Sequence, residues 1–173
     1  MKKRLFISWG IALYVGIFGL LGHLANAQAL LKPTGPVILT VSGKISQRNS
    51  VNSTEFDAQM LRALPQSQIV TKTPWKAPAA RYSGPGLKDL LSAVGAQGQV
   101  LRLIAADRYE VEIPLEDVTR YGPVLAIRMD DKELNIRNRG PVLLMYPFDR
   151  YPEIDSEVYY GRSVWQLERI IVQ

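Results

Sequence analysis

The chain contains no cysteine, and its single histidine is His23. Without cysteine there is no disulfide, no thiolate nucleophile and no thiolate ligand for a metal. A zinc site built from His and Cys is excluded as well, because one histidine cannot make such a site. Beyond Ala27 neither residue occurs, so the chemistry of this part must rest on carboxylates, Arg, Lys, Tyr, Trp and the backbone.

The N-terminus has the pattern of an export signal. Three basic residues at positions 2–4 precede an apolar run over 5–25, which ends in Ala25-Asn26-Ala27. This pattern predicts a signal peptide over residues 1–27, cleaved after Ala27, and therefore a periplasmic protein. The competing interpretation is an uncleaved anchor, because about 20 apolar residues can span a bilayer. In both cases residues 28–173 are expected outside the cytoplasm, as one domain.

The formal net charge of +5 gives little support for a nucleic-acid partner. Three positive charges lie at residues 2–4 and no acid precedes Gln28, which leaves +2 on the rest of the chain. The sequence has no stripe of basic residues interleaved with aromatics. We therefore expect no nucleic-acid binding.

The remainder of the chain has the pattern of many short strands and few helices. Apolar and β-branched runs bounded by Gly, Pro or polar turns predict strands, and apolar residues three or four apart predict helices. The Pro- and Ala-rich segment after Trp75 and the polar segment 149–160 are predicted to be loops. Together these elements predict an α+β single domain dominated by a β-sheet. The predicted strands are 37–43, 68–73, 100–105, 109–113, 124–129, 142–146 and a closing region over 163–172; the predicted helices are 55–63, capped by Thr54, and 87–94, with a helical turn at 115–118.

Several short motifs follow one another in the order seen in a known family. Together they resemble the oxidoreductase molybdopterin-binding domain of the sulfite-oxidase type, over essentially all of residues 28–173. The motifs are Leu39-Thr40-Val41-Ser42-Gly43, Thr73-Pro74-Trp75, Gly84-Pro85-Gly86-Leu87-Lys88-Asp89-Leu90-Leu91, Ala105-Ala106-Asp107-Arg108-Tyr109, Gly140-Pro141 and Arg162-Ser163-Val164-Trp165.

The resemblance implies a sheet-rich fold with a cleft for a pterin-based molybdenum cofactor. In enzymes of that family a cysteine thiolate binds the metal near the end of the strand that corresponds to 69–73. This chain has Lys72-Thr73-Pro74-Trp75 there, and a hydroxyl is a poor substitute for a soft thiolate. In lacking the cysteine it is similar to small periplasmic pterin-binding regulators. These bind a reduced pterin and act on the periplasmic domain of a membrane-bound cyclic-di-GMP enzyme.

Trp75, Asp107 and Tyr109 are candidate pterin-binding residues. An indole face suits a flat pterin, although Trp75 could instead cover the core from a loop. If it binds the ligand, Trp75→Ala should weaken binding and leave the melting temperature nearly unchanged. Asp107 and Asp117 could each accept hydrogen bonds from the amino and ring N–H edge of a pterin, or simply stabilise a turn or a helix end. Asp107 is preferred, because it lies at a corner between strands beside Tyr109.

Arg128, Arg162 and Asp149 complete the candidate set. Arg128 and Arg162, from a group that also holds Arg81 and Arg139, could bind a ligand oxygen or phosphate, or remain solvated. Arg162 is preferred because it lies near Trp165, itself predicted to be a core residue. Asp149 could border the same cleft, as could Tyr146, Tyr159 and Tyr160, and the whole segment 149–160 could be a solvated loop or the surface offered to a protein partner.

Three functions remain open at this stage. The first is an exported pterin-binding protein without turnover or molybdenum, which regulates a membrane signalling protein in response to its ligand. The second is a periplasmic molybdopterin oxidoreductase with atypical metal ligation. The third is a degenerate domain that acts as a structural partner and binds no small molecule. The missing cysteine favours the first, because binding needs only a stacking face and fixed hydrogen bonds.

Overall fold

The computed structural model describes residues 30–173. The predicted signal peptide over residues 1–27 lies outside these described residues. None of the helices in the described part is long and apolar enough to cross a membrane.

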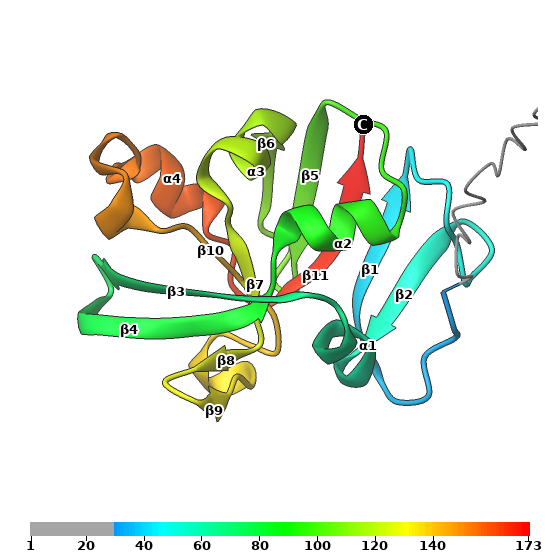
Figure 1. The fold of residues 1–173 in the computed structure, drawn as a ribbon, viewed down its shortest axis with the longest axis horizontal. Coiled ribbons are helices and arrows are strands. Elements are labelled where there is room, and N and C mark those ends of the chain that lie inside the picture. The colour runs from blue at the N-terminus through cyan, green and yellow to red at the C-terminus, as the bar shows by residue number, and fades with distance from the viewer. Residues whose placement is uncertain (1–29) are drawn as a thin grey trace, which may run out of the picture.

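The larger of the sheets has five strands in the order β2-β1-β11-β5-β6. β1 and β11 are parallel, although they lie at opposite ends of the described chain, and the other neighbours are antiparallel. The helix α2 lies across one face of this sheet (Figure 1). The strand bounds are β1 Val37–Gly43, β2 Ser53–Asp57, β5 Val100–Ala105, β6 Glu110–Pro114 and β11 Leu167–Val172.

The second sheet is built on a long hairpin that extends away from the first (Figure 1). β3 and β4 form this hairpin, and β8 and β9 continue the sheet on the β4 side, so β3 is an edge strand. β7 and β10 form a separate antiparallel pair between the two sheets. The bounds are β3 Gln66–Thr73, β4 Lys76–Pro85, β7 Val124–Ala126, β8 Arg128–Met129, β9 Lys132–Glu133 and β10 Leu143–Met145.

The helical elements are short and follow local signals. Asp57 caps the first helix by accepting a hydrogen bond from Met60 N, and Gly122 ends the third in the left-handed conformation. In α2 the side chains of Leu87, Leu90 and Leu91 all face the core. The α-helices are α1 Ala58–Ala63, α2 Leu87–Ala93, α3 Leu115–Tyr121 and α4 Glu157–Arg162, and the 3₁₀ turns are η1 Ile136–Asn138, η2 Phe148–Arg150 and η3 Pro152–Ile154.

A single apolar core joins these layers. Leu39 and Val41 of β1 alternate inward and are fully buried, as the period of a strand requires. The hairpin reaches the core through Gly84 of β4, which lies so close to β7 that an added Cβ would be 2.0 Å from Leu125 O. Only glycine permits this approach, and it fixes the base of the hairpin against the core.

The sheet-rich α+β single domain predicted from the sequence is confirmed, with two corrections before residue 90. The segment after Trp75 was predicted to be a loop and is the strand β4. Its Pro78 lies where the pairing with β3 shifts register, outside the part that pairs with β8, so the proline interrupts no regular ladder. The first helix begins at Ala58, not at residue 55, because Thr54 pairs with β1 in β2 and Asp57 provides the cap.

Two predictions near the C-terminus are also corrected. The segment 149–160 is not one loop, because it contains η2, η3 and most of α4. Trp165 was predicted to be a core residue, but 41% of it is exposed. Its apolar neighbours Val164 and Leu167 are buried, and Trp165 turns outward between them.

Candidate functional site

The turn at the end of the β3–β4 hairpin carries Trp75 into a cluster of aromatic rings. The Trp75 ring makes edge-to-face contacts with Phe148, Tyr160 and Trp165, at centroid distances of 6.4, 6.0 and 5.5 Å. Such contacts stabilise a pair beyond its buried area. The long hairpin therefore holds Trp75 at a fixed place against η2, α4 and the segment that leads into β11.

Two polar atoms at this hairpin end are buried and unsatisfied. Thr73 Oγ1 and Trp75 Nε1 have no hydrogen-bond partner among the described residues. Burial raises the pKa of Tyr82, whereas a hydrogen-bonding contact with the Thr73 side chain and the charge of Arg139 lower it. Thr73 Oγ1 therefore has the Tyr82 hydroxyl near it, and Trp75 Nε1 is the clearer unpaired donor of the two. An unpaired buried donor costs free energy, about 1–3 kcal/mol, so its presence in a folded protein needs an explanation, and a bound ligand is one such explanation.

Arg139 closes one side of this cluster. Its guanidinium carbon lies 4.3 Å from the centre of the Trp165 ring, the shortest cation–π distance in the described chain. Arg139 has a positive φ of 75° and directly precedes Gly140. Its backbone oxygen accepts a 2.9 Å hydrogen bond from Gln166 N, which joins the 136–141 segment to the start of β11. The pair places a cation and an indole at the surface beside Trp75.

A hollow of about 190 Å³ opens next to Trp165. Asp107 and Tyr109 line it from the β5–β6 turn, and Tyr160, Gly161 and Trp165 line it from the opposite side. The Tyr109 hydroxyl donates a 3.0 Å hydrogen bond to Gly161 O across the hollow, and Asp107 Oδ1 accepts one of 2.9 Å from Tyr109 N. The hollow thus combines an aromatic wall with a carboxylate that has an unoccupied second oxygen among the described residues.

Behind this wall a buried ion pair fastens α4. Arg162 Nη1 donates a 2.8 Å hydrogen bond to Asp117 Oδ2, and the Tyr146 hydroxyl donates one of 3.1 Å to the same oxygen. The Arg162 guanidinium also lies 4.7 Å from the centre of the Tyr159 ring. Burial raises the pKa of Tyr146, and the neighbouring Asp117 charge acts in the same direction. These contacts direct Arg162 toward α3, while its neighbours Gly161 and Ser163 line the hollow.

The predicted residues differ in where the structure places them. Trp75, Asp107 and Tyr109 lie at or next to the hollow, and Arg162 lies behind its wall. Asp149 joins η2 to the hairpin, since its carboxylate accepts a 3.1 Å hydrogen bond from Lys72 N. Arg128 lies apart from this group: it donates to Asp131 O in the β8–β9 turn.

The structure brings four further residues to this site, and the sequence had named two of them: Arg139 among the arginines that could bind a ligand oxygen, and Tyr160 as a possible border of the cleft. Thr73 was not named, and Trp165 was assigned to the core. These four contribute a buried hydroxyl, a cation and two ring faces. All four lie in or beside motifs that carry the family resemblance, which was the available signal. Their convergence depends on three segments far apart in the chain, so spacing could not reveal it.

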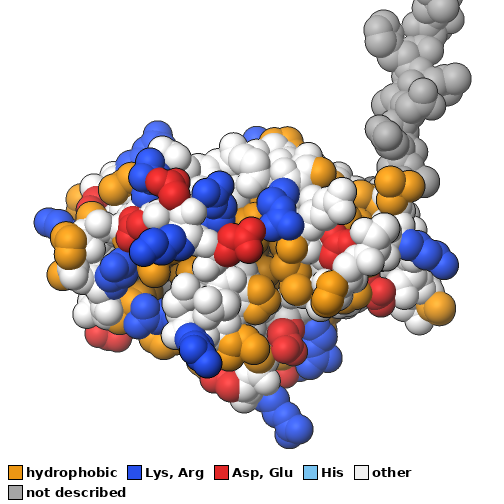
Figure 2. Space-filling view, turned by 90° about the horizontal axis from the view of Figure 1, so that it is seen from below, with side chains coloured by type: hydrophobic (Ala, Val, Ile, Leu, Met, Phe, Trp, Pro, Cys, Tyr) orange, Lys and Arg blue, Asp and Glu red, His pale blue; other side chains and the backbone are white. Residues whose placement is uncertain are grey.

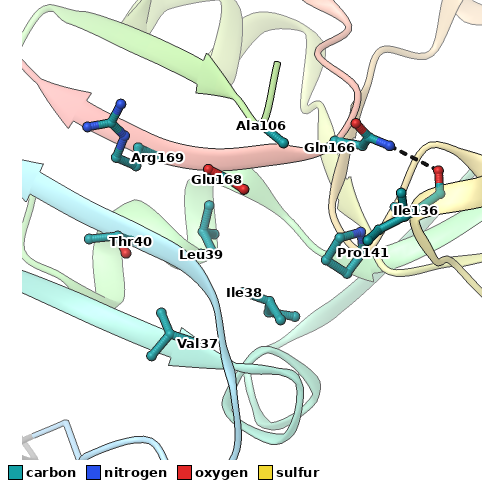
Figure 3. Close-up of a pocket in the computed structure, with 11 residues that line it drawn as sticks. Val37, Ile38, Leu39, Thr40, Ala106, Ile136, Pro141, Gln166, Glu168 and Arg169 are labelled. Atoms are coloured by element: carbon teal, nitrogen blue, oxygen red, sulfur yellow. Dashed lines mark hydrogen bonds between the residues drawn. The ribbon is translucent and has the colours of Figure 1, made fainter. Parts of the chain in front are cut away.

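A larger hollow, of about 490 Å³, lies elsewhere and is lined by none of the predicted site residues. Figure 3 shows it between the start of β1 and the outer face of β11, with Ile136 and Pro141 on the far side. Its charged lining residues are Glu168 and Arg169, and the Gln166 side chain donates across its rim to Ile136 O. It has neither an aromatic wall nor an unpaired buried donor.

No group of three or more His, Cys, Asp or Glu side chains placed to hold a metal ion occurs among residues 30–173. No curated protein is similar enough to the chain to count as a match. The family model described as "Oxidoreductase molybdopterin binding domain" matches residues 39–151, well over half of the chain. This match includes the hairpin, the Asp107 turn and Arg139, and it ends before α4. The chain therefore belongs to the oxidoreductase molybdopterin binding domain family.

Proposed function

We propose that this protein is an exported pterin-binding protein that works without molybdenum catalysis and regulates a membrane-bound cyclic-di-GMP signalling enzyme in response to its ligand. One observation carries the proposal. The indole N–H of Trp75 is buried among aromatic rings, without a partner among the described residues, at the hairpin end where the family resemblance implies a metal-binding cysteine.

The residues present do not fit a bound molybdenum ion. In enzymes of the family that the chain resembles, a soft cysteine thiolate binds the molybdenum, and the chain has no cysteine. The side chains at the corresponding position are a hydroxyl at Thr73 and an indole at Trp75, and neither replaces a thiolate. The proposal therefore assigns this site to binding, with no oxidation or reduction step.

The same residues fit a pterin. Its flat ring matches the faces of Trp165 and Tyr160 that line the hollow, and its carbonyl oxygen can accept a hydrogen bond from Arg139 beside Trp165. Trp75 Nε1 is buried behind these two rings and does not line the hollow, so the proposal requires the rings to move apart when a pterin reaches it. Its amino group can donate to Asp107 at the mouth of the hollow. The hollow of about 190 Å³ is small for a whole pterin, so one edge of the ring system would remain at the surface.

The regulatory part of the proposal rests on the resemblance to small periplasmic pterin-binding regulators together with this site. The proposal that the protein is exported rests on the predicted signal peptide over residues 1–27. Mass spectrometry of the mature N-terminus would test this prediction. A mature chain that begins at Gln28 supports export with cleavage, and a retained N-terminus supports an anchor.

The first experiment is to purify the protein from its native cells, release any bound ligand, and identify it by fluorescence and mass spectrometry. Molybdenum is measured on the same sample. We expect a pterin and no molybdenum. Stoichiometric molybdenum would restore the oxidoreductase with atypical ligation, and the absence of any small molecule would favour a structural partner.

Signalling is tested separately. Replacing the gene by a variant with Trp75→Phe removes the unpaired indole N–H and keeps most of the ring packing. We expect cellular cyclic-di-GMP to change as it does in a gene deletion. If the variant loses pterin and cyclic-di-GMP stays at the wild-type level, the protein binds pterin for another purpose.

A further inference from the structure

We propose that the free edge of β3, together with a basic hollow beside it, binds an extended acidic segment of a partner protein as an added β-strand. This surface shares no residue with the hollow at Trp165, so the proposal does not depend on which ligand that site binds.

The hydrogen-bonding pattern shows which β3 groups are free. The backbone oxygens of Arg81 and Ser83 on β4 accept hydrogen bonds of 2.8 and 3.0 Å from N–H groups that flank β8. These two residues pair with Val70 and Gln68 of β3. In an antiparallel ladder both members of such a pair direct their backbone groups away from each other. Val70 and Gln68 therefore point their N–H and C=O groups to the outer edge of the sheet.

This outer edge is open over the first part of β3. No hydrogen bond from another described residue reaches the backbone of Gln68 or Val70, and Val70 is 58% exposed. The opening ends at Lys72, whose N–H is bound by the Asp149 carboxylate. A row of unpaired backbone groups is the surface to which an extended segment adds as a strand.

A hollow of about 440 Å³ follows this edge. Four consecutive β3 residues, 67–70, line it, although their side chains alternate between the two faces of the strand. The hollow must therefore run along the edge itself and not along one face. Its opposite wall is the end of α3 and the segment from Pro147 to Tyr151.

Two arginines make this hollow basic. Arg120 lies 5.1 Å from the Tyr121 ring centre and Arg150 lies 5.4 Å from the Tyr151 ring centre, and these two rings pack edge to face at 5.2 Å. No Asp or Glu lines the hollow. Arg120 has only a 3.8 Å ion pair with the exposed Glu153, which contributes little, and Arg150 has no ion pair among the described residues.

The charge of the hairpin indicates which occupant fits. β3 carries Lys72 and no acidic residue, and β4 carries Lys76 and Arg81, of which Arg81 is paired with Asp131 at 2.7 Å on the β8 side of the sheet. Figure 2, which views the molecule from below, shows Lys and Arg side chains gathered on the left, on the hairpin side of the molecule. A second copy of this edge would bring like charges together, whereas an acidic strand complements them.

The test uses a blocked nine-residue peptide in which valine alternates with glutamate, titrated into the purified protein and followed by the backbone amide NMR signals. We expect shifts at Gln68 and Val70 and slower hydrogen exchange of these two amides, because their N–H groups become bonded. A peptide N-methylated on the nitrogens that face β3 should not bind, and neither should a lysine counterpart.

Two matched variants distinguish the effect of the arginines in the basic hollow from the effect of the protein's overall positive charge. Arg120→Gln combined with Arg150→Gln should weaken peptide binding about fivefold, whereas Arg48→Gln, at an exposed residue that lines neither hollow, should leave it unchanged. If the N-methylated peptide or free glutamate binds as tightly as the unmodified peptide, the surface binds anions without pairing to a strand, and the proposal is overturned. Unchanged Gln68 and Val70 amides would overturn it too, and so would protection of these amides in a dimer of the free protein.

Discussion

Arg162 and Asp117 form a 2.8 Å ion pair that connects α4 to α3 across 45 residues of sequence. The Asp117 side chain is only 6% exposed and that of Arg162 is 20% exposed. Because Gly161 and Tyr160 line the hollow beside Trp165, this buried pair holds one wall of the candidate site in place. Arg162 is thus a positioning residue and does not itself line the hollow.

Arg162→Met should strongly destabilise the protein. It leaves the Asp117 carboxylate buried with the Tyr146 hydroxyl as its remaining partner, and breaking a buried pair in this way costs about 3 kcal/mol. The free energy of unfolding in urea measures the effect. Adding Asp117→Asn removes the buried charge and keeps an acceptor for Tyr146, so the double variant should recover part of the loss. A double variant less stable than Arg162→Met would contradict this explanation.

Trp75 substitutions separate packing from ligand recognition. Sequence alone suggested that Trp75→Ala would leave the melting temperature nearly unchanged, but the three ring contacts change that expectation. Because Trp75 is only half-buried, truncation to Ala should cost about 2 kcal/mol, less than the roughly 3–5 kcal/mol of a fully buried Trp. Trp75→Phe keeps most of the packing and removes the unpaired N–H, so it should cost little stability and weaken pterin binding.

Thermal unfolding and pterin fluorescence titration of the two Trp75 variants provide the check. Equal pterin affinity in wild type and Trp75→Phe would show that the indole N–H does not contact the ligand. If Trp75→Phe destabilises the protein as much as Trp75→Ala does, the main role of Trp75 is packing and not ligand recognition.

Asp57 gives the protein a specific loss of stability in acid. Hydrogen bonds from Met60 N and Gly35 N lower the pKa of its carboxyl from 3.8 to about 2 in the folded state. A carboxyl with a depressed folded pKa contributes stability above its unfolded pKa, and that contribution disappears as the pH falls through the folded value. The unfolding free energy should therefore drop between about pH 4 and pH 2.

Asp57→Asn is the variant that tests this, with urea unfolding followed from pH 5 to pH 2. The variant should be less stable than wild type at pH 5, and the difference should shrink as the pH falls toward 2. A difference that stays constant over this range would show that the charge of Asp57 is not the cause.

Gly84→Ala tests the close approach of β4 to β7. An added Cβ would meet Leu125 O at 2.0 Å and Ile127 N at 3.1 Å, and both atoms belong to backbone that cannot move aside cheaply. We expect a loss of about 2 kcal/mol in unfolding free energy. Gly35→Ala is the matched control, because its Cβ would meet only ordinary contacts beginning at 3.6 Å, and it should change stability by less than about 0.5 kcal/mol.

Local sequence patterns predicted most strands and misassigned the segment after Trp75. The run from Val37 to Val41 is largely apolar and rich in β-branched residues and ends at Gly43, and this signal lies in adjacent residues. In β4, Pro78 and the small residues around it hide the alternation, and only pairing with β3 makes the segment a strand. Thr54 was misread for the same reason, because its pairing with β1 outweighs its ability to cap a helix.

For the candidate site, the sequence supplied the residue types and the tertiary structure supplied the partners. The absence of cysteine, the family and the choice of Trp75, Asp107 and Tyr109 all follow from the sequence alone. That Arg139 covers Trp165, that Arg162 turns to Asp117, and that Arg128 lies apart were decided only by the fold. The physical reason is that strand register and core packing determine which distant residues meet. Arg139 follows a 3₁₀ turn and Arg162 ends a helix, and the packing of these segments against β11 and α3, which neighbouring residues do not encode, decides which partners the two arginines meet.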